Sequence, residues 1–175
     1  MALLSLSNIH KTFEKGTVNE NHVLRGLDLD IEQGDFISVI GGNGAGKSTL
    51  MNSIAGVVEI DKGDMAIAYR RGKKRSFFKK SITEAERQLF KDKLSELGLG
   101  LENRMKTDAA FLSGGQRQAL TLAMATLVRP KILLLDEHTA ALDPKTSDMV
   151  MQLTKKVVEE EKLTTLMITH NMEHA

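Results

Sequence analysis

The stretch that decides the fold is residues 36–56, which read FISVIGGNGAGKSTLMNSIAG. A short apolar run, Phe36–Ile40, predicts a buried strand. The residues after it, Gly41–Ser48, fit the pattern G-x-x-x-x-G-K-[S/T], and Thr49–Ala55 then predicts a helix that ends at Gly56. Glycines let a backbone wrap closely around phosphate groups, and a helix N-terminus adds a partial positive charge. The stretch therefore predicts a loop that binds the phosphates of ATP.

Two polar side chains at the end of this loop carry its expected chemistry. The ammonium group of Lys47 would contact the β- and γ-phosphates, and the hydroxyl of Ser48 would coordinate Mg²⁺. A glycine-rich turn arising by chance is the alternative, and the flanking strand and helix argue against it. The expected nucleotide-binding residues of this stretch are Gly41, Gly42, Asn43, Gly44, Ala45, Gly46, Lys47, Ser48 and Thr49.

A second apolar run ends in two carboxylates. Ile132–Leu135 is followed by Asp136 and Glu137, and ligands of open α/β sheets bind at the carboxyl ends of the strands. Asp136 would hold Mg²⁺ directly or through water. Glu137 would act as the general base that activates or orients an attacking water. Taken alone, this run could also be a strand that merely ends in acidic residues.

A third motif is Leu-Ser-Gly-Gly-Gln at Leu112–Gln116, just before a helix predicted over about Gly115–Val128. A serine and two glycines at a helix start predict a second anion-binding N-terminus. A chain with two such termini must bind two anions or share one between two copies. The candidate residues are Ser113, Gly114, Gly115 and Gln116.

The rest of the chain alternates strands and helices, which predicts an α/β fold with a largely parallel sheet. Ile132–Leu135 has the wholly apolar pattern of a central parallel strand. Thr83 and Glu86 form a capping box before a helix that stops at Gly98. Its apolar stripe would comprise Ala85, Leu89, Phe90, Leu94 and Leu97; in the next helix Ala119, Leu120, Ala123 and Leu127 would face inward. Further strands are predicted at Leu3–Ile9, Val23–Ile31 and Leu163–Thr169, and a further helix at Lys145–Glu161.

Composition narrows the class of protein. The chain has 175 residues, a formal net charge of +1 and no cysteine. This length fits one domain with a core, and the absence of cysteine excludes disulfides and cysteine metal sites. The small net charge gives no global attraction to nucleic acid or anionic membranes, so no nucleic-acid partner is expected. No apolar run approaches the roughly 20 residues that span a bilayer, and we expect no signal peptide.

A basic segment, Tyr69–Lys80, interrupts the pattern. An acidic or phosphate-bearing partner is one interpretation, and a solvated face or loop is the favoured one. Phe77 and Phe78 indicate that part of the segment packs against something.

The motifs, in this order, resemble the nucleotide-binding domain of ATP-binding-cassette (ABC) proteins. Leu112–Gln116 matches the family's signature motif, Gly41–Ser48 its Walker A motif, and Ile132–Glu137 its Walker B motif with the catalytic glutamate. Ala141–Asp143 resembles the D-loop, and His170 resembles the switch histidine. The resemblance covers nearly the whole chain. It implies a P-loop NTPase fold: one ABC-type ATPase domain over residues 1–175, with a parallel sheet core and N-terminal antiparallel strands. A reduced helical subdomain at about residues 70–128 would carry the signature.

The resemblance also implies how the site is completed. Two copies would pair head to tail around two ATP molecules, with the Walker A motif of one copy facing Ser113 and Gly115 of the other. Phe13 would stack on adenine, and His170 would contact the γ-phosphate and the attacking water, which makes Lys47, Glu137 and His170 the expected catalytic residues. The remaining histidines, His10, His22, His138 and His174, are expected to have no catalytic role.

Two pieces of the family pattern are not found. Only 65 residues separate Lys47 from Ser113, which is short for the family, and no glutamine matches the Q-loop; Gln88 lies inside the capped helix. The chain also ends at Ala175 without the family's closing strands. We expect sequence to be missing near Ala68–Tyr69 and after Ala175, and a chain truly this short to bind ATP but hydrolyse it weakly.

The function implied is that of the ATP-binding and ATP-hydrolysing subunit of an ABC transporter, on the cytoplasmic face of a membrane. Its partners would be a second copy, transmembrane permease subunits and, as a further candidate, a substrate-binding protein. The family resemblance of two stretches, Gly34–Leu50 and Thr139–Lys145, favours bacterial importer subunits, in particular those for amino acids. A non-transport ABC ATPase and an ATP-binding module with impaired hydrolysis are the alternatives.

Overall fold

The computed structural model describes residues 2–67, 83–137, 139 and 141–169. The chain divides into two compact units. Unit 1 comprises Met1–Tyr69, Lys131–Glu137 and Lys162–Ala175, and unit 2 comprises Arg70–Pro130 and His138–Glu161. The predictions for the basic segment, for the position Ala68–Tyr69 and for His138, His170 and His174 all lie outside the described residues.

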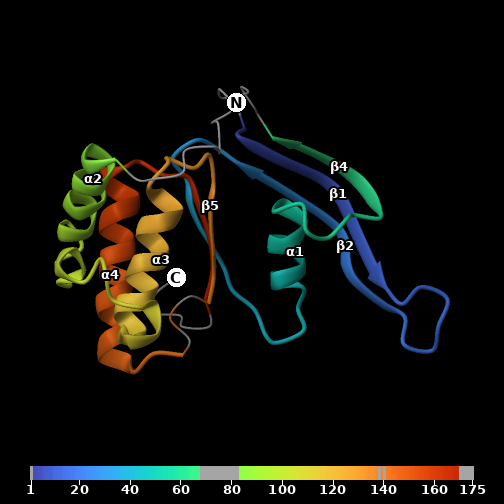
Figure 1. Cartoon of the computed structure of the whole chain (residues 1–175). Coiled ribbons are helices and arrows are strands. Elements are labelled where there is room, and N and C mark those ends of the chain that lie inside the picture. The colour runs from blue at the N-terminus through green and yellow to red at the C-terminus, as the bar shows by residue number, and fades with distance from the viewer. Residues whose placement is uncertain (1, 68–82, 138, 140, 170–175) are drawn as a thin grey trace. The chain divides into compact units, whose positions relative to one another are not determined.

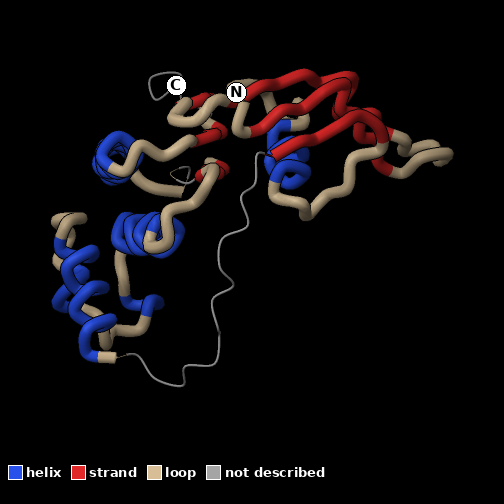
Figure 2. The backbone as a smooth tube through the Cα atoms, turned by 90° about the horizontal axis from the view of Figure 1, so that it is seen from above, coloured by secondary structure: helices blue, strands red, loops and turns tan. Residues whose placement is uncertain are grey.

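One of the two sheets of unit 1 is antiparallel and has the strand order β2-β1-β4. Its strands are β1 (Leu4–Phe13), β2 (Asn21–Ile31) and β4 (Lys62–Ile67). Gly63 is needed where β4 meets β1, because its φ is +105° and an added Cβ would lie 2.4 Å from the carbonyl oxygen of Asn8. Figure 1 shows the three strands running together, and Figure 2 shows α1 against one face of them. This sheet confirms the predicted N-terminal antiparallel strands.

The second sheet of unit 1 is parallel, with the order β3-β6-β5. Its strands are β3 (Phe36–Val39), β5 (Leu133–Asp136) and β6 (Thr165–Ile168). The prediction that Ile132–Leu135 forms the central strand was wrong among the described strands, because β6 lies between the other two and is buried at every position. Phe36 is 39% exposed, so β3 is also less buried than predicted.

Helix α1 (Lys47–Ile54) joins both sheets into one core. Leu50, Met51 and Ile54 pack in a cluster that also contains Leu4 and Ile31 of the antiparallel sheet and Leu166 and Ile168 of β6. Burial of this many aliphatic side chains is the main stabilising contribution in unit 1. It fixes the N-terminal end of α1 at the end of β3.

Unit 2 is built from helices. They are α2 (Glu84–Ser95), α3 (Gly114–Thr126) and α4 (Pro144–Glu160), with short turns η1 (Leu101–Asn103) and η2 (Ala109–Phe111). Figure 1 shows α3 and α4 side by side. Their core contains Leu97, Leu101, Leu112 and Ala119. Three side chains of the predicted apolar faces are exposed in the structure: Ala85, Leu89 (53%) and Leu127 (41%).

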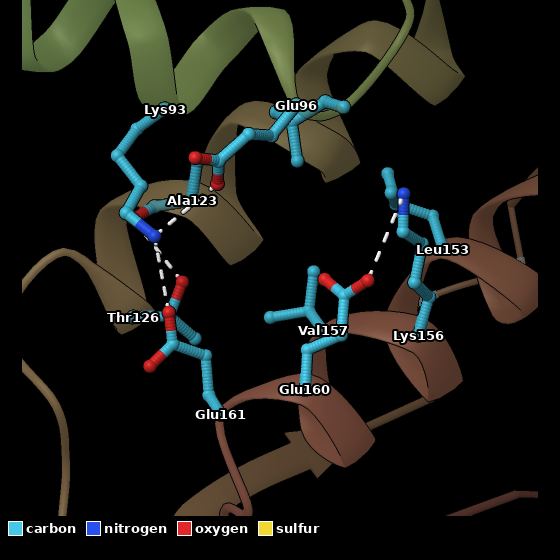
Figure 3. A pocket seen from close by; sticks show the side chains of 10 residues that line it. Lys93, Glu96, Ala123, Thr126, Leu153, Lys156, Val157, Glu160 and Glu161 are labelled. Atoms are coloured by element: carbon cyan, nitrogen blue, oxygen red, sulfur yellow. Dashed lines mark hydrogen bonds and ion pairs between the residues drawn. The ribbon is translucent and has the colours of Figure 1, made fainter.

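One ion pair joins α2 to the end of α4 within unit 2, and a second lies at the end of α2 itself. Lys93 donates to Glu161 at 3.0 Å and to Glu96 at 3.2 Å (Figure 3). The hydrogen bond to Glu161, followed by that to Glu96, raises the pKa of Lys93. The cavity beside them measures about 30 Å³, which is room for about one water. Among the described residues, no helix is long and apolar enough to cross a membrane.

Candidate nucleotide-binding site

The parallel sheet brings two of the predicted motifs to one edge. Val39 of β3 and Asp136 of β5 are both in register with Ile168 of β6. Neighbouring strands lie about 4.8 Å apart, so the backbones of Val39 and Asp136 are separated by about 10 Å. Both motifs therefore lie at the carboxyl edge of the sheet, where ligands of such sheets bind. The loop Gly41–Ser48 follows β3 there, and Asp136 and Glu137 lie at the end of β5.

Lys47 is held inside its own loop. Its Nζ donates to the carbonyl oxygen of Gly41 at 2.8 Å and to that of Gly42 at 3.0 Å. The residue is only 8% exposed, and a buried ammonium group needs such acceptors. Phosphate oxygens are stronger acceptors than carbonyl oxygens. The ammonium group of Lys47 could therefore exchange the two loop carbonyl oxygens for the oxygens of a phosphate.

The start of α1 leaves backbone donors available to an anion. The N-cap, Gly46, has a φ of 90° and makes no side-chain cap, and the first N–H groups of a helix have no partner within the helix. An added Cβ at Gly46 would lie 2.8 Å from Cγ1 of Val23. Glycine at this position is therefore required both by the backbone angle and by the close approach of β2.

Asp136 and Glu137 differ in exposure and in backbone shape. Asp136 ends β5 and is exposed. Glu137 is half-buried, has a φ of 45°, and donates its N–H to the carbonyl oxygen of Ile168 at 3.2 Å. A non-glycine residue in this left-handed region stores strain, which is found most often at functional sites.

The donors suit Mg²⁺ chemically. The hydroxyl of Ser48 is exposed, as is the carboxylate of Asp136, and both belong to unit 1. Mg²⁺ prefers oxygen ligands, takes only one or two from a protein, and completes its shell with water and substrate phosphates. The described residues contain no group of three or more acidic, histidine or cysteine side chains suited to a metal.

Phe13 ends β1 and is paired with Asn21. Its ring is 38% exposed, and Nζ of Lys11 lies 5.4 Å from the ring centroid. An exposed aromatic ring at a strand end can stack on a base, as the resemblance implies for Phe13.

The signature residues begin α3 in unit 2. Ser113 is the N-cap: its side chain accepts the N–H of Gln116 at 3.2 Å, and the side chain of Gln116 accepts the N–H of Ser113 at 3.2 Å. Gln116 also donates to the carbonyl oxygen of Leu99. A Cβ at Gly114 would lie 2.7 Å from Leu142, and one at Gly115 would lie 2.6 Å from Thr146. The two glycines thus let α3 approach the start of α4.

The sequence analysis missed this capping box. The spacing Ser-x-x-Gln is the same signal that identified Thr83 and Glu86, so it could have been found. The sequence placed Asp143 in the D-loop but did not predict that it caps α4 ahead of Pro144, where it accepts the N–H of Thr146 at 3.1 Å. Hydrogen bonds from the Thr146 side chain and then its backbone hold the pKa of Asp143 below its usual range.

The structure therefore brings the Walker A residues, Asp136, Glu137 and Phe13 into unit 1. It places the signature residues and the D-loop residues Ala141–Asp143 in unit 2. The family model described as ABC transporter matches residues 24–140 of the chain. The chain belongs to the ABC transporter family.

Relatives agree on the role within the family. The chain is 36% identical over 211 aligned positions to a tyrosine transport ATP-binding protein of Clostridioides difficile, covering 99% of this chain and 84% of the relative. It is 35% identical to a methionine import ATP-binding protein of Enterococcus faecalis, covering 98% of this chain and 59% of that relative. The chain is accordingly an ATP-binding subunit of the ABC transporter type. The ATP-binding proteins of this family are ATPases.

Solved cassettes of this family have the same fold. The dimeric bacterial ABC transporter cassette MJ0796 is 26% identical, with a TM-score of 0.77 over 98% of this chain and 90% of that one. The same cassette in a post-hydrolysis state bound to ADP and Pi gives a TM-score of 0.74 at 27% identity. The predicted P-loop NTPase fold is confirmed.

One comparison bears on the length of the chain. The match with the tyrosine transport relative spans 211 aligned positions, whereas this chain has 175 residues. The relative therefore has residues at positions where this chain has none. Within the matched stretch the chain is therefore shorter than this relative.

Proposed function

We propose that the chain binds ATP with Mg²⁺ at Gly41–Ser48 and hydrolyses it while paired head to tail with a second copy. Hydrolysis would drive transport through separate permease subunits, with the chain on the cytoplasmic face of the membrane. The observation that carries the proposal is Lys47: a buried ammonium group held by carbonyl oxygens of the loop, at the sheet edge where Asp136 and Glu137 emerge.

ATP would be held mainly by unit 1. Lys47 moves from the carbonyl oxygens of Gly41 and Gly42 to the β- and γ-phosphates, and the N–H groups at the start of α1 donate to the same oxygens. Phe13 stacks on adenine. Ser48 and Asp136 hold Mg²⁺, which neutralises phosphate charge when bound.

Glu137 would accept a proton from the attacking water or orient it. Its left-handed backbone directs the side chain differently from an extended continuation of β5. His170, which the resemblance assigns to the γ-phosphate, completes the catalytic set.

The second copy would supply the signature residues. Ser113 can still donate its hydroxyl proton while its oxygen caps α3, and the N–H groups of Gly114 and Gly115 lie in the first turn of that helix. The bonds of Gln116 to Ser113 and to Leu99 suit a positioning role for its side chain.

The transported substrate would be read by the partner chains. Relatives are named for tyrosine transport and for methionine import, and this supports an amino acid as the cargo. A substrate-binding protein is then a further expected partner, since the importer class uses one.

The test is ATP hydrolysis by the full chain and two Glu-to-Gln variants. Glu137→Gln should bind ATP normally but hydrolyse it about 100-fold more slowly or worse, because the general base is lost. Glu59→Gln, at an exposed position of unit 1, should leave both binding and hydrolysis unchanged. Equal rates in all three proteins would remove Glu137 from the mechanism.

A second candidate function is an ATP-binding module with impaired hydrolysis. The 211 aligned positions against 175 residues favour it, because the segment that carries a Q-loop was not found. Unit 2 also has an open apolar groove of about 350 Å³ lined by residues such as Leu94, Leu120 and Met124, as a reduced helical segment would leave exposed. If this second function is correct, the wild-type chain binds ATP but hydrolyses it slowly, at a rate no higher than that of Glu137→Gln.

A further inference from the structure

Two histidines meet on the antiparallel sheet of unit 1. His10 of β1 and His22 of β2 are half-buried, and their rings are stacked with centroids 5.3 Å apart. Nδ1 of His10 lies 3.2 Å from Nε2 of His22. A hydrogen bond between them needs one donor and one acceptor nitrogen, so at least one ring is neutral. Sequence reasoning assigned neither residue a role.

Neighbouring residues fix the orientation of the His10 ring. Its Nε2 lies 2.9 Å from Oδ1 of Asn8. An amide oxygen only accepts hydrogen bonds, so Nε2 of His10 carries a proton. When the His10 ring is neutral, its Nδ1 therefore carries the lone pair. Asn8 is held in turn, because its N–H donates to Asp28 at 2.7 Å while its φ is 51°. The irregular register between Ile9 and His10 lies beside this strained residue.

The distance between the two facing ring nitrogens fits a shared transition-metal ion. Zinc–nitrogen bonds are about 2.0–2.1 Å long, so two imidazole nitrogens on a tetrahedral ion lie about 3.4 Å apart. The 3.2 Å between Nδ1 of His10 and Nε2 of His22 is close to that spacing. Metal-bound histidines commonly donate their other ring N–H to a fixed oxygen, which is the relation of His10 to Asn8.

We propose that His10 and His22 form a two-nitrogen site for a divalent transition-metal ion of the Zn²⁺ type. Nδ1 of His10 and Nε2 of His22 bind the ion, Asn8 orients His10, and water completes the coordination shell. The site is separate from the oxygen donors Ser48 and Asp136 and takes a different class of ion, because imidazole favours Zn²⁺ and Cu²⁺ over Mg²⁺.

The surrounding charges set limits on the affinity. Arg25 and Lys62 are both paired in register with His10, and Arg25 donates to the carbonyl oxygen of His22. These cations oppose a dication, whereas Asp28 behind Asn8 favours one. The bound ion would link β1 to β2 across a separation of 12 residues, near Phe13 at the end of β1, and so raise the unfolding temperature.

The experiment is a calorimetric titration of the full, untagged and nucleotide-free chain with ZnCl₂. Excess Mg²⁺ is present, so that oxygen-donor sites are occupied by the harder ion. We expect one equivalent of Zn²⁺ to bind and the unfolding temperature to rise. His10→Gln and His22→Gln should each weaken binding more than about tenfold, and Asn8→Gly, which tolerates the positive φ, should weaken it about tenfold. His174→Gln is the matched control and should bind as the wild type does.

Failure of the wild-type chain to bind Zn²⁺ would overturn the proposal. Binding of equal strength by the double variant His10→Gln/His22→Gln would also overturn it, since the ion would then lie elsewhere. The unfolding temperature of each variant without metal shows whether it folds; should His10→Gln fail to fold, His22→Gln and Asn8→Gly decide the question.

Discussion

Gly46 shows at the scale of one residue how the fold and the proposed binding loop depend on each other. Its φ is +90°, and an added Cβ would lie 2.8 Å from Val23. Gly46→Ala should therefore destabilise unit 1 by about 1–3 kcal/mol, through backbone strain and displacement of β2. Urea unfolding measures the change.

Gly44 supplies the control for that substitution. Its φ is +79°, but nothing lies within 4 Å of an added Cβ, so Gly44→Ala should cost only the backbone strain of about 1 kcal/mol. Equal losses for the two variants would show that the contact with Val23 contributes nothing.

The sequence predicted the types of residue in the loop better than their contacts. The motif placed the glycines correctly between a strand and a helix, but the helix begins at Lys47 and includes Ser48, two residues earlier than predicted. It could not predict that Lys47 donates to Gly41 and Gly42, or that Glu137 has a left-handed backbone, because both depend on how the loop and β6 meet in space.

Helix α2 is an element with a local cap that can be tested. Thr83 accepts the N–H of Glu86, and Glu86 accepts the N–H of Thr83. Thr83→Ala should lower the free energy of unfolding of unit 2 by about 1 kcal/mol, whereas Thr83→Ser should retain the cap. Helicity and urea unfolding of both variants provide the measurement, and an unstable Thr83→Ser would point to a cause other than the cap.

Asp61 lies just before β4 and links the start of that strand to β1. Its carboxylate accepts the N–H of Thr12 at 2.6 Å and pairs with Lys15 and Lys11. The bond from Thr12, then those from Lys15 and Lys11, lowers the pKa of Asp61 from 3.8 to about 2. A lowered folded-state pKa gives stability that is present above the unfolded-state value and is lost as the pH falls through the folded-state value.

The consequence is a pH-dependent difference between wild type and Asp61→Asn. The variant should be less stable at pH 7, and the difference should shrink as the pH falls from about 3.8 to about 2. Urea unfolding across this range measures it, with Asp64→Asn, on the exposed side of β4, as the control. A difference that stays constant with pH would mean that the charge of Asp61 does not matter.

At the element scale, periodicity predicted the kind of the strands β1, β2, β3, β5 and β6 and of the helices α1 to α4, but not which strands are neighbours. Ile132–Leu135 and Leu163–Thr169 were both predicted as strands, and composition alone could not tell that β6 lies in the middle and β5 beside it. The exposure of Leu89 and Leu127 was missed for a similar reason, since an apolar stripe shows which face can pack but not whether a neighbour covers all of it.

At the scale of the whole molecule, the order of motifs was the strongest signal, because it covers nearly the full chain. The family match over residues 24–140 confirms it. The resemblance implied a helical subdomain at about residues 70–128, but not that residues 138–161 gather into the same compact unit, because local patterns do not report which distant segments pack together. The proposed pairing of Walker A with a partner's Ser113 is likewise a property of the assembly.

The central claim is that Gly41–Ser48 binds ATP through Lys47, and the dissociation constant for ATP with Mg²⁺ tests it most directly. Calorimetry on the full chain should show binding. Loss of one charged hydrogen-bonding group should weaken binding about 10- to 100-fold in Lys47→Ala, while the exposed Lys91→Ala should match the wild type. Equal affinities for all three proteins, or no binding of ATP by the wild-type chain, would contradict the account.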